Sequence, residues 1–387
     1  MFVGVAWSLP VLFDLGRWIE QPLARWILLV LFLCFASRIT GAVNHIKTID
    51  WARDFTTMMN YVWTFYVLLG FKLHQNIRRL YAAVLVVVGV FTVYVTTYYL
   101  QIRGFTEGTD WSRNIRPSDG VVLFGTFMSL GMANASTGKI RRRWLLVNTA
   151  FLLATLLTGT RTHLIALPAG YITVAWLLIR DRNPGARRML LGLVAPAVIA
   201  LSLFVGSVAT GLISKDAVLD RIEKAEEGTE AMTIVNRIQE ARDSIQVFSK
   251  HPIFGVGLGY KLGEVFVIGH SLDPQDDYFI HNFYLYVLVK FGLVGVFVFG
   301  GFLMSPFITA VKGYRRADSA FERGIFGGIA GLMASLYVES LAANRFSDRT
   351  STALMAMVFA MLMVLYRPYV GRKKPDSAHG RAGATNA

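Results

Sequence analysis

The sequence has few of the residues and patterns on which soluble enzymes commonly depend. Cysteine occurs once, as Cys34 within an apolar run, so an intrachain disulfide is excluded. Charged residues make up only 17% of the 387 residues and hydrophobic residues 54%, which leaves too little polar surface to cover a soluble fold. No HExxH, CxxC or P-loop pattern is present, so the sequence gives no support for metal or ATP chemistry, and we predict no cofactor.

Long apolar runs are what the sequence has instead. Most approach the length of a helix that crosses a bilayer, about 20 residues. Such helices satisfy their own backbone hydrogen bonds in lipid, so the runs predict an all-α polytopic membrane protein with about 10–12 transmembrane helices. The first run follows no basic segment, so we expect no signal peptide. The predicted spans are at about 2–13, 23–40, 55–71, 80–102, 120–136, 144–159, 164–179, 189–213, 282–309, 324–342 and 352–366.

Positive charge is distributed unevenly between the connections. One alternate set is short and rich in Lys and Arg, which predicts a cytoplasmic location; it comprises 72–79, 139–143, 180–188, 312–323 and 367–381. The other set is expected to face outward and comprises 41–54, 103–119, 160–163, 214–281 and 343–351. Topology and attraction to anionic membrane lipids account for the net charge of +14. We therefore predict no nucleic-acid partner.

These patterns divide the chain into four parts. We expect an N-terminal transmembrane bundle over 1–213, one large external loop over 214–281, C-terminal membrane helices over 282–367 and a disordered basic tail over 368–387. Most other connections are short. A long polar loop in this setting is typical of a functional segment.

An amphipathic helix is predicted within this loop, over residues 233–249. Its apolar residues recur at intervals of three or four, which describes one stripe: Val235, Ile238, Ala241, Ile245 and Phe248. We expect this helix to rest on the outer face of the bundle and to end at His251-Pro252. Arg237 and Glu240 lie off the stripe, and spacing alone favours a solvated pair about one turn apart.

Arg161 lies in a connection too short to extend far from the outer edge of the bilayer. An arginine so close to hydrocarbon is costly unless its charge is satisfied. Its planar fork suits a phosphate or carboxylate ligand, but a structural arginine that satisfies helix ends or lipid phosphate explains it equally well. His163, two residues on, is expected to point elsewhere in a structural role.

His281 precedes the apolar helix that leaves the loop. The positive end of that helix disfavours the imidazolium ion, so a neutral ring able to accept a proton is expected. The same helix end can hold an anionic group. Asp276 and Asp277 are close enough in sequence to orient the ring. A histidine that merely caps the helix is the commoner case for an isolated residue.

A glycine-rich segment and two charged residues within apolar spans have both a functional and a structural interpretation. Gly255, Gly257 and Gly259 do not form a GxGxxG pattern, so we predict a tight turn or a close backbone approach and no nucleotide site. Lys290 and Glu339 lie within apolar spans, where a charge marks a site, a pathway or an ion pair. A structural ion pair is favoured for each, with Arg345 or Arg349 near Glu339.

Three segments taken in order resemble the O-antigen ligase and polymerase superfamily: LLTGTRTHLIAL, NRIQEARDSIQVFSKHPIFGVGLG and HNFYLYVLVKFGLVGVFVF. The resemblance covers about 150–305. It implies a bacterial inner-membrane, GT-C-like glycosyltransferase with its site facing the periplasm. Such proteins transfer a glycan from an undecaprenyl-diphosphate carrier without metal or nucleotide, ligases to lipid A-core and polymerases to a second carrier-linked glycan. Family ligases often have twelve helices, and this chain has one or two fewer predicted spans.

The resemblance also implies roles for three residues. Arg161 and Arg237 resemble the arginines that would bind the diphosphate and stabilise it as a leaving group. His281 resembles the histidine that would take or position the acceptor hydroxyl proton in a displacement with inversion. A ligase is slightly favoured over a polymerase. A lipid-linked glycan transporter or a membrane scaffold remains as an alternative from another class.

Overall fold

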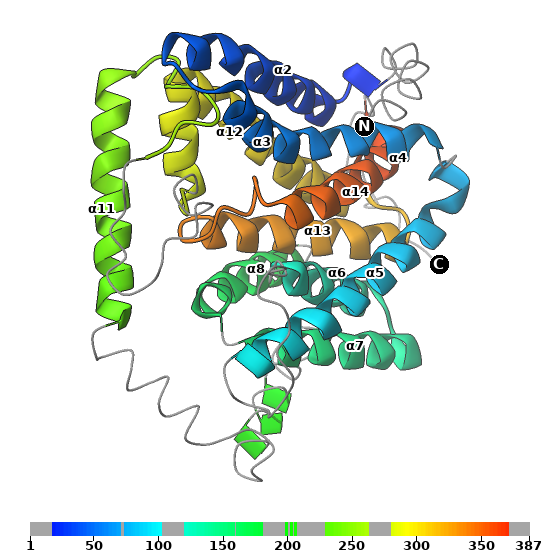
Figure 1. Cartoon of the computed structure of the whole chain (residues 1–387). Helices are drawn as coiled ribbons and strands as arrows, with labels where there is room; N and C mark the ends of the chain where they lie inside the picture. Colours follow the sequence, from blue (N-terminus) through cyan, green and yellow to red (C-terminus); the bar gives the residue numbers. More distant parts are fainter. Residues whose placement is uncertain are drawn as a thin grey trace, which may run out of the picture.

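The computed structural model describes residues 18–70, 73–102, 120–158, 160–180, 229–262 and 280–370, with short pieces at 198–199, 202–203 and 205–206. These residues form helices joined by turns and contain no strand (Figure 1). Five helices, α2, α5, α8, α12 and α14, are long and apolar enough to cross a membrane. The chain is therefore an all-α polytopic membrane protein, as predicted. The elements are α2 (Pro22–Val43), α3 (Thr48–Met58), η1 (Met59–Val62), α4 (Trp63–Gly70), α5 (Leu73–Ile102), α6 (Val121–Ala135), α7 (Gly138–Thr158), α8 (Arg161–Arg180), α11 (Thr229–Lys250), α12 (Phe283–Arg316), α13 (Ala320–Glu339), α14 (Arg349–Tyr366) and η3 (Arg367–Tyr369).

Every predicted span that falls within the described residues coincides with helix. The span at 2–13, most of that at 189–213, and most of the predicted tail lie outside the described residues. Boundaries differ where basic connections were expected: residues 73–79 form the first turns of α5, and residues 139–143 those of α7. Lys, Arg and Gln are good helix formers, and long basic side chains reach water from a helix end, so a basic stretch does not interrupt a helix.

Helix α13 is the centre of the bundle, in contact with α6, α8 and α12. Its contact with α6 is made through glycines. A Cβ at Gly131 of α6 would meet the backbone of Gly324 and Gly328 of α13. Small residues of this kind let membrane helices approach closely and pack through their backbones.

The connections rich in Lys and Arg and the other set of connections lie at separate ends of the bundle. At one end Asn344 donates to the carbonyl of Ile280 at 3.1 Å, and Arg345 packs against Gly120. At the other end Arg78 lies over the ring of Phe321, and Arg316 donates to the carbonyl of Tyr369 at 3.0 Å. Helix α11 runs across the first of these ends, at the left of Figure 1.

Helix α12 is broken at Gly292, which has φ 62° and ψ −154°. The break leaves backbone groups on both sides without helical partners, and a loop that follows α11 supplies them. Four hydrogen bonds fill the break: Val256 N to Val289 O at 2.9 Å, Gly257 N to Lys290 O at 3.0 Å, Leu293 N to Pro252 O at 2.8 Å and Val294 N to Ile253 O at 3.1 Å. The break therefore docks the loop after α11 onto the helix that His281 precedes.

The close backbone approach predicted for GVGLG is present in this loop. Gly255, Gly257 and Gly259 all have positive φ, of 66°, 97° and 80°. A Cβ at Gly255 would lie 2.5 Å from the backbone nitrogen of Phe291, and one at Gly259 would lie 2.4 Å from that of Trp51. Only glycine meets both requirements without strain.

Candidate functional site

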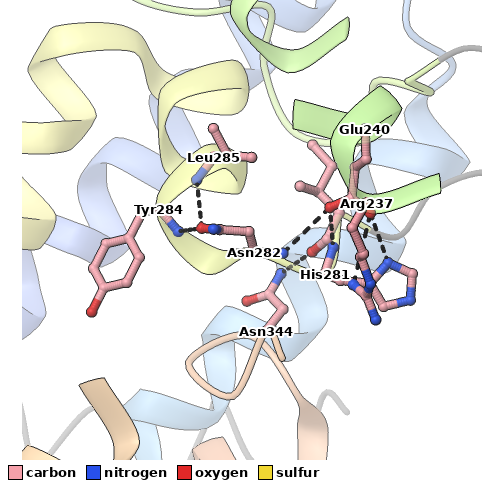
Figure 2. A network of polar contacts seen from close by, with 8 residues as sticks. Arg237, Glu240, His281, Asn282, Tyr284, Leu285 and Asn344 are labelled. Atoms are coloured by element: carbon pink, nitrogen blue, oxygen red, sulfur yellow. Dashed lines mark hydrogen bonds and ion pairs between the residues drawn. The ribbon is translucent and has the colours of Figure 1, made fainter. Parts of the chain in front are cut away.

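The start of α12 is fixed by its own capping residue. The side chain of Asn282 accepts hydrogen bonds from the backbone N–H of Tyr284 at 2.9 Å and of Leu285 at 3.2 Å. An amide oxygen at this position satisfies N–H groups that the first turn leaves without helical partners. His281, one residue earlier, is thereby held at a defined helix end (Figure 2).

Glu240 of α11 forms hydrogen bonds with this helix end. Its Oε2 lies 2.9 Å from Nδ1 of His281, and its Oε1 accepts from the backbone N–H of His281 at 2.8 Å and more weakly from that of Asn282 at 3.4 Å. The glutamate side chain is only 7% exposed. A buried carboxylate needs such donors. The contact joins two segments 41 residues apart in the chain.

Arg237, one turn before Glu240, completes the cluster. One of its terminal nitrogens lies 3.8 Å from Oε2 of Glu240. Burial raises the pKa of Glu240, an effect opposed by Arg237 and by the N–H of Asn282. Burial lowers the pKa of Arg237, and Glu240 opposes that shift. The arginine side chain is still 38% exposed, although its Nη1 atom is buried.

The arrangement determines which nitrogen of His281 can act as a base. When Nδ1–H donates to the Glu240 carboxylate, the neutral ring carries its lone pair on Nε2. A carboxylate in this position holds the tautomer and stabilises the imidazolium that forms when Nε2 takes a proton. The His281 side chain is 41% exposed, so a ligand can approach the ring. Glu240 thus opposes the helix dipole, which alone favours the neutral ring.

The helix predicted over 233–249 is present as α11, but the face predicted to rest on the bundle is wrong. Ile238 and Ile245, from the predicted apolar stripe, are 48% and 57% exposed, whereas Glu240 and Ser244 are 5% and 1% exposed. The polar side therefore faces the bundle. Hydrogen bonds to the start of α12 compensate the cost of burying Glu240. The spacing of apolar residues, on which the prediction was based, contains no information about such hydrogen bonds.

Arg161 is the first residue of α8. Its side chain lies outside the described part of the structure, but its neighbour His163 is fully buried and shows how this helix end is held. Nε2 of His163 lies 3.0 Å from Glu339, which pairs with Nε of Arg345 at 2.6 Å. The turn after α13 that holds Arg345 also contacts Ile280 through Asn344 and Phe283 through Ser340. One turn therefore fastens both the start of α8 and the start of α12.

Lys290 and Glu339 do not meet; each has partners of its own. Lys290 is fully buried and its Nζ lies 3.1 Å from Oδ2 of Asp54, with a hydrogen bond of 2.6 Å to the carbonyl of Tyr260. Asp54 also accepts from the N–H of Gly259 at 2.8 Å. The ion pair predicted for each of these two charges is therefore present. Glu339 pairs with Arg345, and it also contacts His163.

Asp276 and Asp277, expected as possible partners of His281, lie outside the described residues. Glu240 was missed as the partner because spacing linked it only to Arg237. The sequence does place Glu240 on the same helical face as Arg237 and Ser244, and this polar face could have indicated a buried contact. Among the described residues, no group of three or more His, Cys, Asp or Glu side chains is placed to hold a metal ion.

Comparison with known proteins gives one positive finding. Residues 145–300 match the family model described as O-antigen ligase. This range includes Arg161, Arg237, Glu240 and His281. No curated protein matches the chain. The match over this part of the chain supports the resemblance to the O-antigen ligase and polymerase superfamily that the three motifs predict.

Proposed function

We propose that the protein transfers a glycan from an undecaprenyl-diphosphate carrier to an acceptor hydroxyl at the periplasmic face of the bacterial inner membrane. The contact between Glu240 and Nδ1 of His281 carries this proposal, because it prepares a base at an exposed helix end. The family match over residues 145–300 supports the same class of reaction. The acceptor is lipid A-core in a ligase, which we favour, or a second carrier-linked glycan in a polymerase.

Arg161 and Arg237 are assigned to the diphosphate of the donor. Guanidinium groups bind phosphate oxygens through parallel, charge-assisted hydrogen bonds. They also stabilise the negative charge that develops as the diphosphate leaves. The Arg237 side chain is partly exposed and lies 3.8 Å from Glu240, the residue that contacts the proposed base.

His281 is assigned to the acceptor. Its Nε2 takes the hydroxyl proton as the acceptor oxygen forms a bond to the anomeric carbon of the donor sugar. The bond from that carbon to the diphosphate oxygen breaks, and undecaprenyl diphosphate leaves. A direct displacement of this kind inverts the configuration of the sugar carbon. It uses protein side chains alone, so we propose a metal-independent enzyme.

A transporter for lipid-linked glycans is the alternative from another class. It would use the two arginines to bind diphosphate but would not need a base. The hydrogen-bonded His281–Glu240 pair favours the enzyme, because a binding site for an anionic ligand gains nothing from an added buried carboxylate.

Reconstituted proteoliposomes test the proposal. The purified protein receives undecaprenyl-diphosphate glycan with lipid A-core, or with further donor, in the absence of ATP and added metal. Transfer to lipid A-core identifies a ligase, and a lengthened donor glycan identifies a polymerase. Arg161→Ala, Arg237→Ala and His281→Ala should abolish transfer, whereas Arg242→Ala, which removes an exposed arginine of the same helix α11, should not. Activity that survives all three substitutions would refute the mechanism, and glycan movement without transfer would favour the transporter.

A further inference from the structure

An apolar groove lies at the end of the bundle away from His281. It has a volume of about 540 Å³, within the range of about 300–1,000 Å³ that small-molecule sites occupy. Its walls come from α5, α6, α7 and α13, and its lining is almost entirely apolar or aromatic: Tyr81, Leu85, Met132, Trp144, Phe151 and Phe321. The groove is therefore suited to a hydrocarbon chain.

Aromatic rings that pack against one another form part of the wall of the groove. Tyr81 packs edge-on against both Trp144, at 6.0 Å between ring centroids, and Phe321, at 5.7 Å. The hydroxyl of Tyr81 donates to the carbonyl of Met128 at 3.0 Å, so its polar atom turns away from the groove. Val86 and Val147, which also line the groove, are 65% and 38% exposed, so it opens onto the outer surface of the bundle.

One end of this groove carries positive charge. The exposed side chain of Arg78 lines the groove, with its guanidinium 5.4 Å from the centroid of the Phe321 ring. Residues 139–143, which lead directly to Trp144 in α7, contain one lysine and three arginines. A basic end beside an apolar channel complements a molecule with an anionic head and an acyl chain.

We propose that this groove binds an anionic phospholipid, with one acyl chain between α5 and α7 and its phosphate at Arg78. The site is separate from the Arg237–Glu240–His281 cluster and does not depend on the proposed glycan transfer. A zwitterionic lipid of the same chain length would fill the groove but would gain less from Arg78, because its headgroup carries its own cation.

Native mass spectrometry of the full chain in detergent tests the site, with phosphatidylglycerol and phosphatidylcholine of identical chains as probes. Phosphatidylglycerol should bind more tightly than phosphatidylcholine, and Arg78→Ala should weaken it about fivefold, the equivalent of one basic contact with an anionic lipid. Arg79→Ala is the matched control, because Arg79 is also exposed but does not line the groove. Ala82→Trp fills the groove without a change of charge and should weaken both lipids, whereas Ala83→Trp, on an exposed neighbour that does not line it, should not.

Three results would overturn the proposal. Equal binding of the two lipids would show that the charge of the headgroup does not contribute to binding. An equal loss in the Arg78 and Arg79 variants would indicate general surface attraction. Displacement of the lipid by inorganic phosphate, with no effect of Ala82→Trp, would indicate an anion site without a chain-binding groove.

Discussion

Glu240 is the residue on which the candidate site depends. It holds His281 through the ring and through the backbone, and it lies against Arg237. The pairing of Glu240 with Arg237 could be predicted from the sequence, because three residues separate neighbours on a helix. The contact with His281 could not, because it joins segments 41 residues apart and depends on how α11 is turned.

Glu240→Gln is predicted to lower the rate of transfer by about 10²-fold or more, within the range that proton transfer contributes. The amide keeps the size of the side chain but does not stabilise an imidazolium. Donor binding should change little, because Arg161 and Arg237 remain. Single-turnover transfer and donor binding, measured separately, check this prediction. An equal loss of both would mean that Glu240 supports only the fold.

The pH profile supplies a second test of the pair. Burial raises the pKa of Glu240, so the carboxylate becomes protonated at a higher pH than an ordinary glutamate, and activity falls on acidification. Glu240→Gln removes this titration, so the acid limb of its residual activity should move to lower pH. An unmoved limb would contradict the assigned role.

Lys290 and Asp54 form another pair, in which a buried charge depends on its partner as Glu240 does. Lys290→Met alone should destabilise the protein by about 3–5 kcal/mol, the usual cost of leaving one member of a buried pair, and the double variant with Asp54→Asn should recover much of that loss. Thermal unfolding in detergent checks this. Additive losses in the double variant would show that the two charges are not coupled.

At the scale of elements, helices could be predicted but their breaks and faces could not. The apolar run at 282–309 predicts one span, yet α12 changes direction at Gly292, and the loop after α11 supplies the hydrogen bonds of the break. The apolar content of a segment does not reveal that one of its residues has a positive φ. The predicted stripe of α11 failed for a related reason, because its buried face is held by polar contacts.

Gly292→Ala tests the break. Positive φ disfavours any residue with a Cβ by about 1–2 kcal/mol, and a Cβ here would also lie 2.5 Å from the carbonyl oxygen of Ile253. We expect a lower unfolding temperature and a loosened loop. Gly300→Ala is the matched control in the same helix, where a Cβ would meet nothing within 4 Å. Equal stability of the two variants would mean that the break is not constrained.

At the scale of the whole molecule, the distribution of Lys and Arg predicts two ends of the bundle, and the contacts at each end agree with it. Asn344 with Ile280 and Arg78 with Phe321 each join connections from one set only. The assignment of these ends to compartments is testable with single cysteines. Cys34 is fully buried and should contribute little background.

We predict that a membrane-impermeant maleimide, added to cells with a permeabilised outer membrane, labels Arg242→Cys and not Arg142→Cys. Both positions are exposed, on α11 and α7, so access and not burial separates them. Labelling of Arg142→Cys alone would invert the topology and place His281 in the cytoplasm.

The most direct test of the account is single-turnover glycan transfer by His281→Ala with donor binding measured on the same preparation. We predict that the variant binds undecaprenyl-diphosphate glycan within about twofold of the unaltered protein, while transfer falls by about 10²–10⁴-fold, the contribution of a positioned proton acceptor. Transfer at an undiminished rate would contradict the role of His281. Loss of donor binding in parallel with transfer would assign His281 to the binding of the diphosphate and leave the reaction without its base.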